Sequence, residues 1–297
     1  MTRRLMHLLA ALPLLVLVGC SGTADPEVDA PPTRASGAPS SGAPGSEAPT
    51  VTPLPPARYR SSVPDRTVRT PGGYLVNRCV PPSLRRHATT LTTSDGVHLS
   101  TLVLGSGTKG VLLSHEQGYY ICSFLGLARR LAADGYLVVL PEYRNHGASE
   151  GTPDNEHIER DTEAALAELE RQGAERVFLG GASCGGTASA VVGARDGVRE
   201  RLVGLLNMSS PAWCGGLNSP RAVKRITAPS LFVVSPGDMD GAVEEQVRVV
   251  HKASAAADKE LVIDPSGFHG TDMLGAPGTG PALEQRVLAF IEGTFTD

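Results

Sequence analysis

Aromatic side chains are scarce in this chain of 297 residues, where they make up 4% of the sequence and include a single tryptophan. We therefore expect no aromatic-lined platform for binding sugars. Basic residues are not in excess, because the formal net charge is −4 and no run of Lys or Arg occurs, which argues against a nucleic-acid partner. No Cys-x-x-Cys or His-x-x-x-His spacing is present, so we expect neither a zinc site nor another cofactor.

A long apolar run is also missing, because the apolar stretch at residues 8–18 is too short to span a bilayer comfortably. It follows Arg3 and Arg4, as in a secretory signal peptide. The sequence Leu17–Val18–Gly19–Cys20 then resembles the lipobox of bacterial lipoproteins. This resemblance implies removal of residues 1–19, a diacylglycerol on the sulfur of Cys20, and an extracytoplasmic protein anchored to the cell membrane. The alternative is an ordinary secreted protein with a cysteine at its cleavage site.

Residues 21–66 are rich in Pro, Ser, Gly, Ala and Thr and contain almost no large apolar side chains. Such a segment cannot bury enough surface to offset the entropy lost on ordering, so we predict a disordered tether over residues 20–66. A coil of roughly 45 residues reaches about 35–40 Å. The remaining residues, 67–297, are long enough for one domain with a sizeable core.

Apolar strands and amphipathic helices alternate through this domain. The pattern predicts a hairpin over residues 88–103, followed by strands at 110–114, 136–140, 176–179, 202–207, 230–235 and 260–263, and helices at 124–132, 158–172, from 183, 242–256 and 282–295. This alternation is typical of the α/β class, with a mostly parallel sheet and helices on both faces. Ligands in such sheets bind at the carboxyl ends of the strands.

The pattern Gly-x-Ser-x-Gly occurs twice, around Ser149 and around Ser183. Either match alone is weak, because the chain contains 34 glycines. Ser149 lies among turn residues, whereas Ser183 has a strand before it and a helix after it, as a nucleophile elbow requires. We therefore predict that Ser183 is a nucleophile, the alternative being a small residue selected only for a tight turn.

From residue 86 onward the chain resembles the α/β-hydrolases. In that family a serine after the fifth strand is followed by an acid after the seventh and a histidine after the eighth, which here implies Ser183, Asp238 and His269. The histidine would act as the base and the acid would orient it. Asp240 remains an alternative to Asp238, and we interpret Asp272 as a helix or loop capping residue.

The family also implies an oxyanion hole made of two backbone amides. One is that of Cys184, directly after the nucleophile, and the other maps to Gln117 in the loop after the third strand. Glu116 stands where the family usually has glycine, which puts a carboxylate near this site unless it turns away. By the same resemblance His115 braces the loop rather than reacting.

The segment Glu142–Ser149 resembles the Asp-x-Arg-Gly-His-Gly-x-Ser turn of the same family, with Glu142 and Asn145 in place of the usual Asp and Gly. That turn is architectural, so the two replacements bear on folding more than on activity. The second Gly-x-Ser-x-Gly match lies in this turn.

Four cysteines follow the lipobox, at positions 79, 122, 184 and 214. In an exported protein an even set predicts one or two disulfides, but three complete pairings are possible and the sequence does not choose among them. A bridge between Cys184 and Cys214 would brace the elbow.

The resemblance implies a serine hydrolase that cleaves carboxylic esters through an acyl-enzyme. Two alternatives remain open: a surface lipoprotein that uses the fold only for binding, and an acyltransferase or peptidase with the same triad. The stretch over residues 209–229, where many relatives insert a lid, has only about 20 residues. We therefore expect a minimal lid, an open site for small or surface-presented esters, and a monomer.

Overall fold

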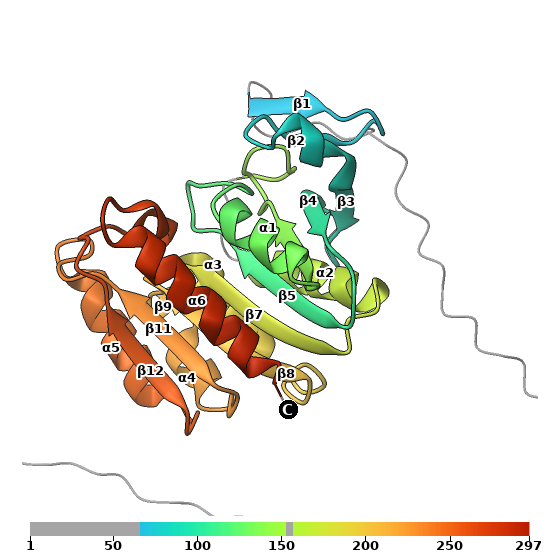
Figure 1. Ribbon diagram of the computed structural model, residues 1–297. Coiled ribbons are helices and arrows are strands. Elements are labelled where there is room, and N and C mark those ends of the chain that lie inside the picture. Colours follow the sequence, from blue (N-terminus) through green and yellow to red (C-terminus); the bar gives the residue numbers. More distant parts are fainter. Residues whose placement is uncertain (1–65, 153–156, 297) are drawn as a thin grey trace, which may run out of the picture. The chain divides into compact units, whose positions relative to one another are not determined.

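The computed structural model describes residues 66–152 and 157–296 (Figure 1). The predicted signal peptide, Cys20 and the predicted tether as far as residue 65 lie outside the described residues. Among the described residues, no helix combines the length and the apolar character that crossing a bilayer requires.

Within the described residues, the main sheet has eight strands in the order β12-β11-β8-β7-β5-β6-β4-β3. The sheet is parallel except for β4, which runs antiparallel to both of its neighbours. The strands are β3 (Ala88–Thr92), β4 (His98–Leu104), β5 (Lys109–Ser114), β6 (Leu137–Pro141), β7 (Arg176–Ala182), β8 (Leu202–Met208), β11 (Ser230–Val234) and β12 (Lys259–Ile263). The mostly parallel sheet predicted from the sequence is therefore confirmed.

Helices cover both faces of this sheet (Figure 1). One face packs against α1 (Leu125–Ala133) and α6 (Gly280–Thr294), and the other against α2 (Ile158–Arg171), α3 (Cys184–Gly193), α4 (Ser219–Val223) and α5 (Ala242–Ala253). Because successive side chains of a strand point to opposite faces, the strands contribute side chains to two separate hydrophobic cores, one on each face of the sheet. This double burial explains why β5, β6 and β11 are almost wholly apolar and buried.

Several short elements were not predicted from the sequence. They are a hairpin of β1 (Thr67–Arg69) and β2 (Leu75–Asn77), a hairpin of β9 (Trp213–Cys214) and β10 (Leu217–Asn218), the helix α4, and the 3₁₀ helices η2 (Pro82–His87) and η3 (Gly270–Gly275). The β9–β10 hairpin and α4 fill the stretch over residues 209–229, where the sequence predicted only a minimal lid.

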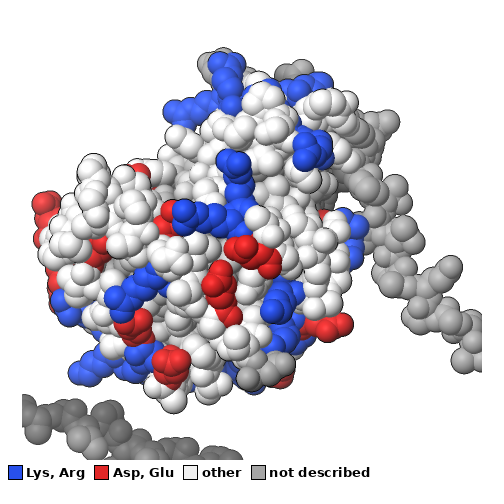
Figure 2. Space-filling model, in the orientation of Figure 1, with Lys and Arg blue, Asp and Glu red and all other residues white. Residues whose placement is uncertain are grey.

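Charged side chains are mixed on the face that carries α1 and α6. Figure 2 shows Lys and Arg interspersed with Asp and Glu over these two helices, whereas the end of the molecule with β1 and β2 shows mainly basic side chains. This distribution fits the small net charge of the chain.

Candidate active site

The turn between β7 and α3 holds Ser183 in an unusual backbone conformation. Its φ and ψ angles are 48° and −127°, which side-chain-bearing residues rarely adopt and which cost free energy. The Ser183 amide donates a hydrogen bond to the carbonyl oxygen of Met208 in β8, at 2.8 Å. Ser183 thus lies at the carboxyl edge of the sheet, in a strained turn between a strand and a helix.

Two glycines make this turn possible. A Cβ atom on Gly181 would lie 2.5 Å from the carbonyl carbon of Gly185, and a Cβ atom on Gly185 would lie 2.4 Å from the carbonyl oxygen of His115. Both distances are far below van der Waals contact, so neither position accepts a side chain. The spacing of glycines around Ser183 therefore follows from how closely α3 approaches β5 and β7.

His269 and Asp238 meet although they come from different loops. Asp238 follows β11, His269 follows β12, and the imidazole Nδ1 lies 2.8 Å from the Asp238 Oδ1. The Asp238 side chain is fully buried, whereas that of His269 is 28% exposed. The hydrogen bond that the imidazole donates to this carboxylate raises the pKa of His269. Asp240, the alternative acid, is exposed and does not occupy this position.

A proton on the Nδ1 of His269 is fixed by its carboxylate partner. The other ring nitrogen, Nε2, is then left with a lone pair that can accept a proton. The raised pKa also makes the imidazolium easier to form. The pair therefore has the properties of a general base that is oriented by a buried acid.

The histidine loop packs directly against the serine turn. Gly270 has a φ of +54°, and a Cβ atom built there would lie 3.4 Å from the Cβ of Ala182, the residue before Ser183. The Gly270 amide donates to the hydroxyl of Ser209 at 3.0 Å. The residue after His269 thus lies close to the residue before Ser183.

The loop after β5 is held by two histidines. His115 Nε2 accepts a hydrogen bond from the Tyr143 amide at 3.0 Å, so its Nδ1 carries the proton and donates to the Glu116 carbonyl oxygen at 2.7 Å. Burial, followed by the charge of His146, lowers the pKa of His115 to about 3. His146 Nε2 accepts from the Gly118 amide at 3.0 Å. These contacts agree with the bracing role predicted for His115.

The two predicted oxyanion donors lie at exposed or half-buried positions on this edge of the sheet. Gln117 is in an exposed turn between His115 and Gly118. Cys184 is the first residue of α3, where backbone amides have no partner within the helix. The positive end of the helix dipole adds to the preference for a negative charge at such a position.

Glu116 is buried and turned toward the histidine loop. Its Oε1 accepts hydrogen bonds from the amide of Thr271, at 3.0 Å, and from the Thr271 hydroxyl. Burial raises the pKa of this carboxyl. Sequence reasoning noted Glu116 as unusual but missed Thr271 and Ser209. Ser209 directly follows β8 and Thr271 lies in η3, and no local signal distinguishes either hydroxyl residue.

Two disulfides lie in the described part of the chain. Cys79 is bonded to Cys122, and Cys184 is bonded to Cys214 with 5.6 Å between their Cα atoms. The sequence left three complete pairings open. The structure has the pairing in which Cys184, at the start of α3, is joined to Cys214 in the β9–β10 hairpin. The disulfide thus ties the residue directly after Ser183 to the β9–β10 hairpin.

The other Gly-x-Ser-x-Gly serine is structural. Ser149 is fully buried, its hydroxyl donates to the Glu142 carbonyl oxygen, and it accepts a hydrogen bond from the Ser100 amide at 2.9 Å. Glu142 is buried too, and its carboxylate accepts from the Asn77 side chain at 2.7 Å and from the Ala148 amide at 2.6 Å. Burial raises the pKa of Glu142 to about 7.

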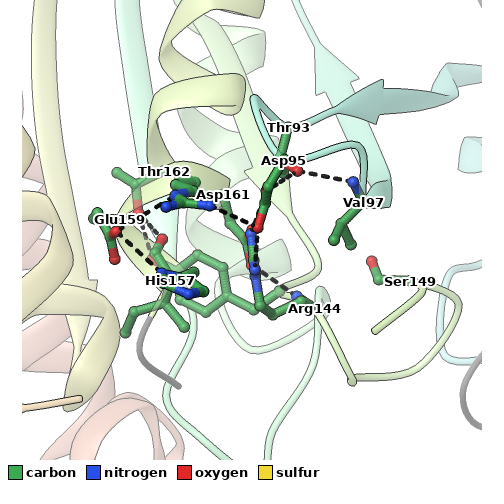
Figure 3. A network of polar contacts seen from close by, with 12 residues as sticks. Thr93, Asp95, Val97, Arg144, Ser149, His157, Glu159, Asp161 and Thr162 are labelled. Carbon is green, nitrogen blue, oxygen red and sulfur yellow. Dashed lines mark hydrogen bonds and ion pairs between the residues drawn. The ribbon is translucent and has the colours of Figure 1, made fainter. Parts of the chain in front are cut away.

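An ion-pair network fixes the same turn to its neighbours. Figure 3 shows Arg144 between Asp161 of α2 and Asp95 of the β3–β4 turn. The guanidinium lies 2.7 Å from Asp161 and 2.9 Å from Asp95, and its side chain is only 4% exposed. These contacts agree with the architectural role predicted for the segment over residues 142–149.

Asp272 was interpreted from the sequence as a helix or loop capping residue, and in the structure His269, not Asp272, occupies the N-cap position of η3. Asp272 lies in the first turn of η3 and accepts a hydrogen bond from the Tyr119 hydroxyl. This bond raises the pKa of Tyr119 to about 12.

A pocket of about 600 Å³ opens beside the histidine loop. Its walls include Phe268 and Thr271, which flank His269 in sequence, and Tyr119 and Tyr120 from the segment after β5. The volume suits a small organic ligand. Phe268 is 43% exposed, so the pocket has an open, aromatic rim.

Comparison with solved structures identifies similar molecules. A thermophilic esterase from Thermogutta terrifontis matches with a TM-score of 0.56 and 17% identity, over 70% of this chain and 99% of the esterase. An esterase from Pyrococcus furiosus matches with a TM-score of 0.58 and 17% identity, over 78% of this chain and 99% of that one. A monoacylglycerol lipase from Paleococcus ferrophilus matches with a TM-score of 0.56 and 16% identity, over 66% and 99%.

No protein-family model matches the sequence, and no curated protein matches it either. Identities as low as 16–17% carry information about the fold only. Together with the strand order of the main sheet, these similarities identify the α/β-hydrolase fold that the sequence predicted.

Proposed function

We propose that this protein is a serine hydrolase that cleaves carboxylic esters and is anchored by lipid outside the cytoplasm. The observation that carries the enzymatic part is the 2.8 Å contact between His269 Nδ1 and the buried Asp238, next to a strained turn that presents Ser183. Esterases and lipases among the structurally similar proteins support the same class of reaction.

In this mechanism the Ser183 hydroxyl attacks the ester carbonyl while His269 Nε2 accepts its proton. Asp238 holds the imidazole and stabilises the positive charge that forms on it. The amides of Cys184 and Gln117 would bind the developing oxyanion, and one such donor contributes about 3–4 kcal/mol to the transition state. The imidazolium then gives the proton to the departing alcohol.

The second half of the reaction uses the same groups. Water takes the place of the alcohol, His269 accepts a proton from it, and the oxyanion forms again in the same hole. Collapse of this intermediate releases the carboxylic acid and restores the Ser183 hydroxyl. The chemistry requires no group beyond these side chains and amides.

Substrates would bind at the carboxyl edge of the sheet, where the loops that carry Ser183 and His269 lie. Between β8 and β11 the described chain has only the short stretch with the β9–β10 hairpin and α4, and the Cys184–Cys214 disulfide ties that hairpin to the start of α3. A short cover suits small esters, or esters presented on a surface, better than long acyl chains that need a deep tunnel.

The membrane attachment is proposed from the sequence alone. Cys20→Ser should move the protein from the membrane fraction to the soluble extracytoplasmic fraction, because the diacylglycerol has no sulfur to join. Fractionation followed by immunoblotting measures the change. A variant that stays with the membrane would contradict lipidation at this residue.

Hydrolysis of a short-chain chromogenic ester by the wild type and by Ser183→Ala tests the enzymatic part. The wild type should hydrolyse the ester and the variant should not. A wild type that binds esters without turnover would point to a binding protein instead. Product analysis with added alcohols, amines or peptides then separates hydrolysis from acyl transfer and peptide cleavage.

A further inference from the structure

Glu116 joins the two loops that the proposed reaction must keep together. It follows β5 and precedes Gln117, yet its carboxylate accepts hydrogen bonds from the amide and the hydroxyl of Thr271, two residues after His269. The Glu116 residue is only 1% exposed. A contact across 155 residues of sequence thus links the proposed oxyanion loop to the histidine loop.

The carboxylate fits into space that only a glycine leaves free. A Cβ atom on Gly270 would lie 2.8 Å from Glu116 Oε1, and it would also touch the Cβ of Ala182 in the elbow. The Gly270 amide is held by the Ser209 hydroxyl at 3.0 Å. The backbone directly after His269 is therefore enclosed by Glu116, the elbow and the end of β8.

Burying the Glu116 carboxylate in this way lowers the stability of the folded state. A buried carboxylate loses hydration, and the Oε2 of Glu116 is buried with no hydrogen-bond partner among the described residues. Burial accordingly raises the pKa of Glu116. Glu142 offers a contrast, because hydrogen bonds reach both of its carboxylate oxygens. A buried, incompletely satisfied carboxyl beside a proposed catalytic histidine is more consistent with a role in the site.

We propose that Glu116 is a positioning residue, whose carboxylate ties the loop of the oxyanion amide to the loop of the histidine so that both hold their places. The proposal rests on the serine hydrolase function proposed above. The reaction needs an oxyanion donor and a base aligned on the same carbonyl at the same moment. Displacing one of them by about 1 Å can cost roughly 100-fold in rate.

Three substitutions separate this role from a purely structural one. Glu116→Ala removes the acceptor for Thr271 and should lower kcat by about 100-fold while KM changes by less than about threefold. Glu116→Gln keeps an acceptor oxygen and should stay within about fivefold of the wild-type kcat, because the tie survives. Glu142→Gln is the matched control, a buried glutamate of the architectural turn, and should leave kcat unchanged.

Thr271→Val tests the same tie from its other end. It should lower kcat, and it should add less to Glu116→Ala than it costs alone, because both changes break one interaction. Hydrogen exchange of amides 270–272 should be faster in Glu116→Ala than in Glu142→Gln. If Glu116→Ala does not fold, the kcat values of Glu116→Gln and Thr271→Val test the proposal instead.

Several results would overturn the proposal. They are a wild-type kcat in Glu116→Ala or in Thr271→Val, equal losses in the Ala and Gln variants, full additivity with Thr271→Val, or unchanged exchange of amides 270–272. Failure of the proposed function looks different, because the wild type itself would then hydrolyse no ester. An active wild type with an unaffected Glu116→Ala refutes the role of Glu116 alone.

Discussion

Removing the Cys184–Cys214 disulfide should impair both stability and turnover, whereas removing Cys79–Cys122 should impair stability alone. Cys184 carries one of the proposed oxyanion amides, and its bond to Cys214 ties the first turn of α3 to the β9–β10 hairpin. Cys79–Cys122 links the segment after β2 to the segment before α1. The second bridge is thus a matched control for the first.

The two bridges should contribute similar amounts to stability. They close loops with sequence separations of 30 and 43 residues, for which the chain-entropy relation gives about 3.6 and about 4 kcal/mol. In a domain of this size, either loss should lower the melting temperature by about 10 °C. Stability alone therefore cannot explain a difference in turnover between the variants.

Turnover should differ because only one bridge touches the elbow. Losing one oxyanion donor costs about 10²–10³ in kcat, and a donor that is displaced rather than removed should cost about tenfold. We therefore expect Cys184→Ser/Cys214→Ser to lower kcat about tenfold and Cys79→Ser/Cys122→Ser to leave it within about twofold.

The assay combines ester hydrolysis, well below both melting temperatures, with fluorescence of the single tryptophan. Trp213 is 62% exposed and adjoins Cys214, so its anisotropy reports on the hairpin. Anisotropy should fall in the Cys184/Cys214 variant only. Equal losses of kcat in the two double variants, or a wild-type kcat in Cys184→Ser/Cys214→Ser, would refute the reasoning.

Two further predictions follow from the charged groups. Arg144→Met should lower the free energy of unfolding by about 3–5 kcal/mol in a urea titration, because it leaves the carboxylate of Asp161 buried without its partner; a loss below about 1 kcal/mol would contradict this. The acid limb of the pH profile of kcat/KM should have its midpoint above 6.5. His269 must be neutral to accept a proton, and its pKa is raised from 6.5, first of all by the hydrogen bond to Asp238. Activity is then lost as the pH falls through that raised pKa, and a midpoint below 6 would count against His269 as the base.

The order of strands and helices could be predicted from the sequence because it depends on local patterns. Mostly apolar strands such as β5 and β11 and the amphipathic helices α2 and α5 were predicted to within three residues at each end. The short β9–β10 hairpin and η3 were missed, because two-residue strands and single turns depend on tertiary contacts.

In the candidate site too, features that depend on local patterns could be predicted and features that depend on distant contacts could not. Ser183 was predicted from a strand end and its flanking glycines, and His269 from the chain order of the family that the sequence resembles. Asp238 was predicted by the same resemblance, with Asp240 as the alternative. The disulfide pairing and the contact of Glu116 with Thr271 depend on how distant loops meet. A hydrogen bond between residues 155 apart leaves no local pattern.

Reaction with a fluorophosphonate probe, read by intact mass and peptide mapping, tests the central claim most directly, because only a serine activated by a neighbouring base reacts rapidly with it. We predict one adduct on the wild type, located at Ser183, and none on Ser183→Ala, which should also lose ester hydrolysis. An unlabelled wild type, or a Ser183→Ala variant that is labelled and hydrolyses esters at the wild-type rate, would contradict it.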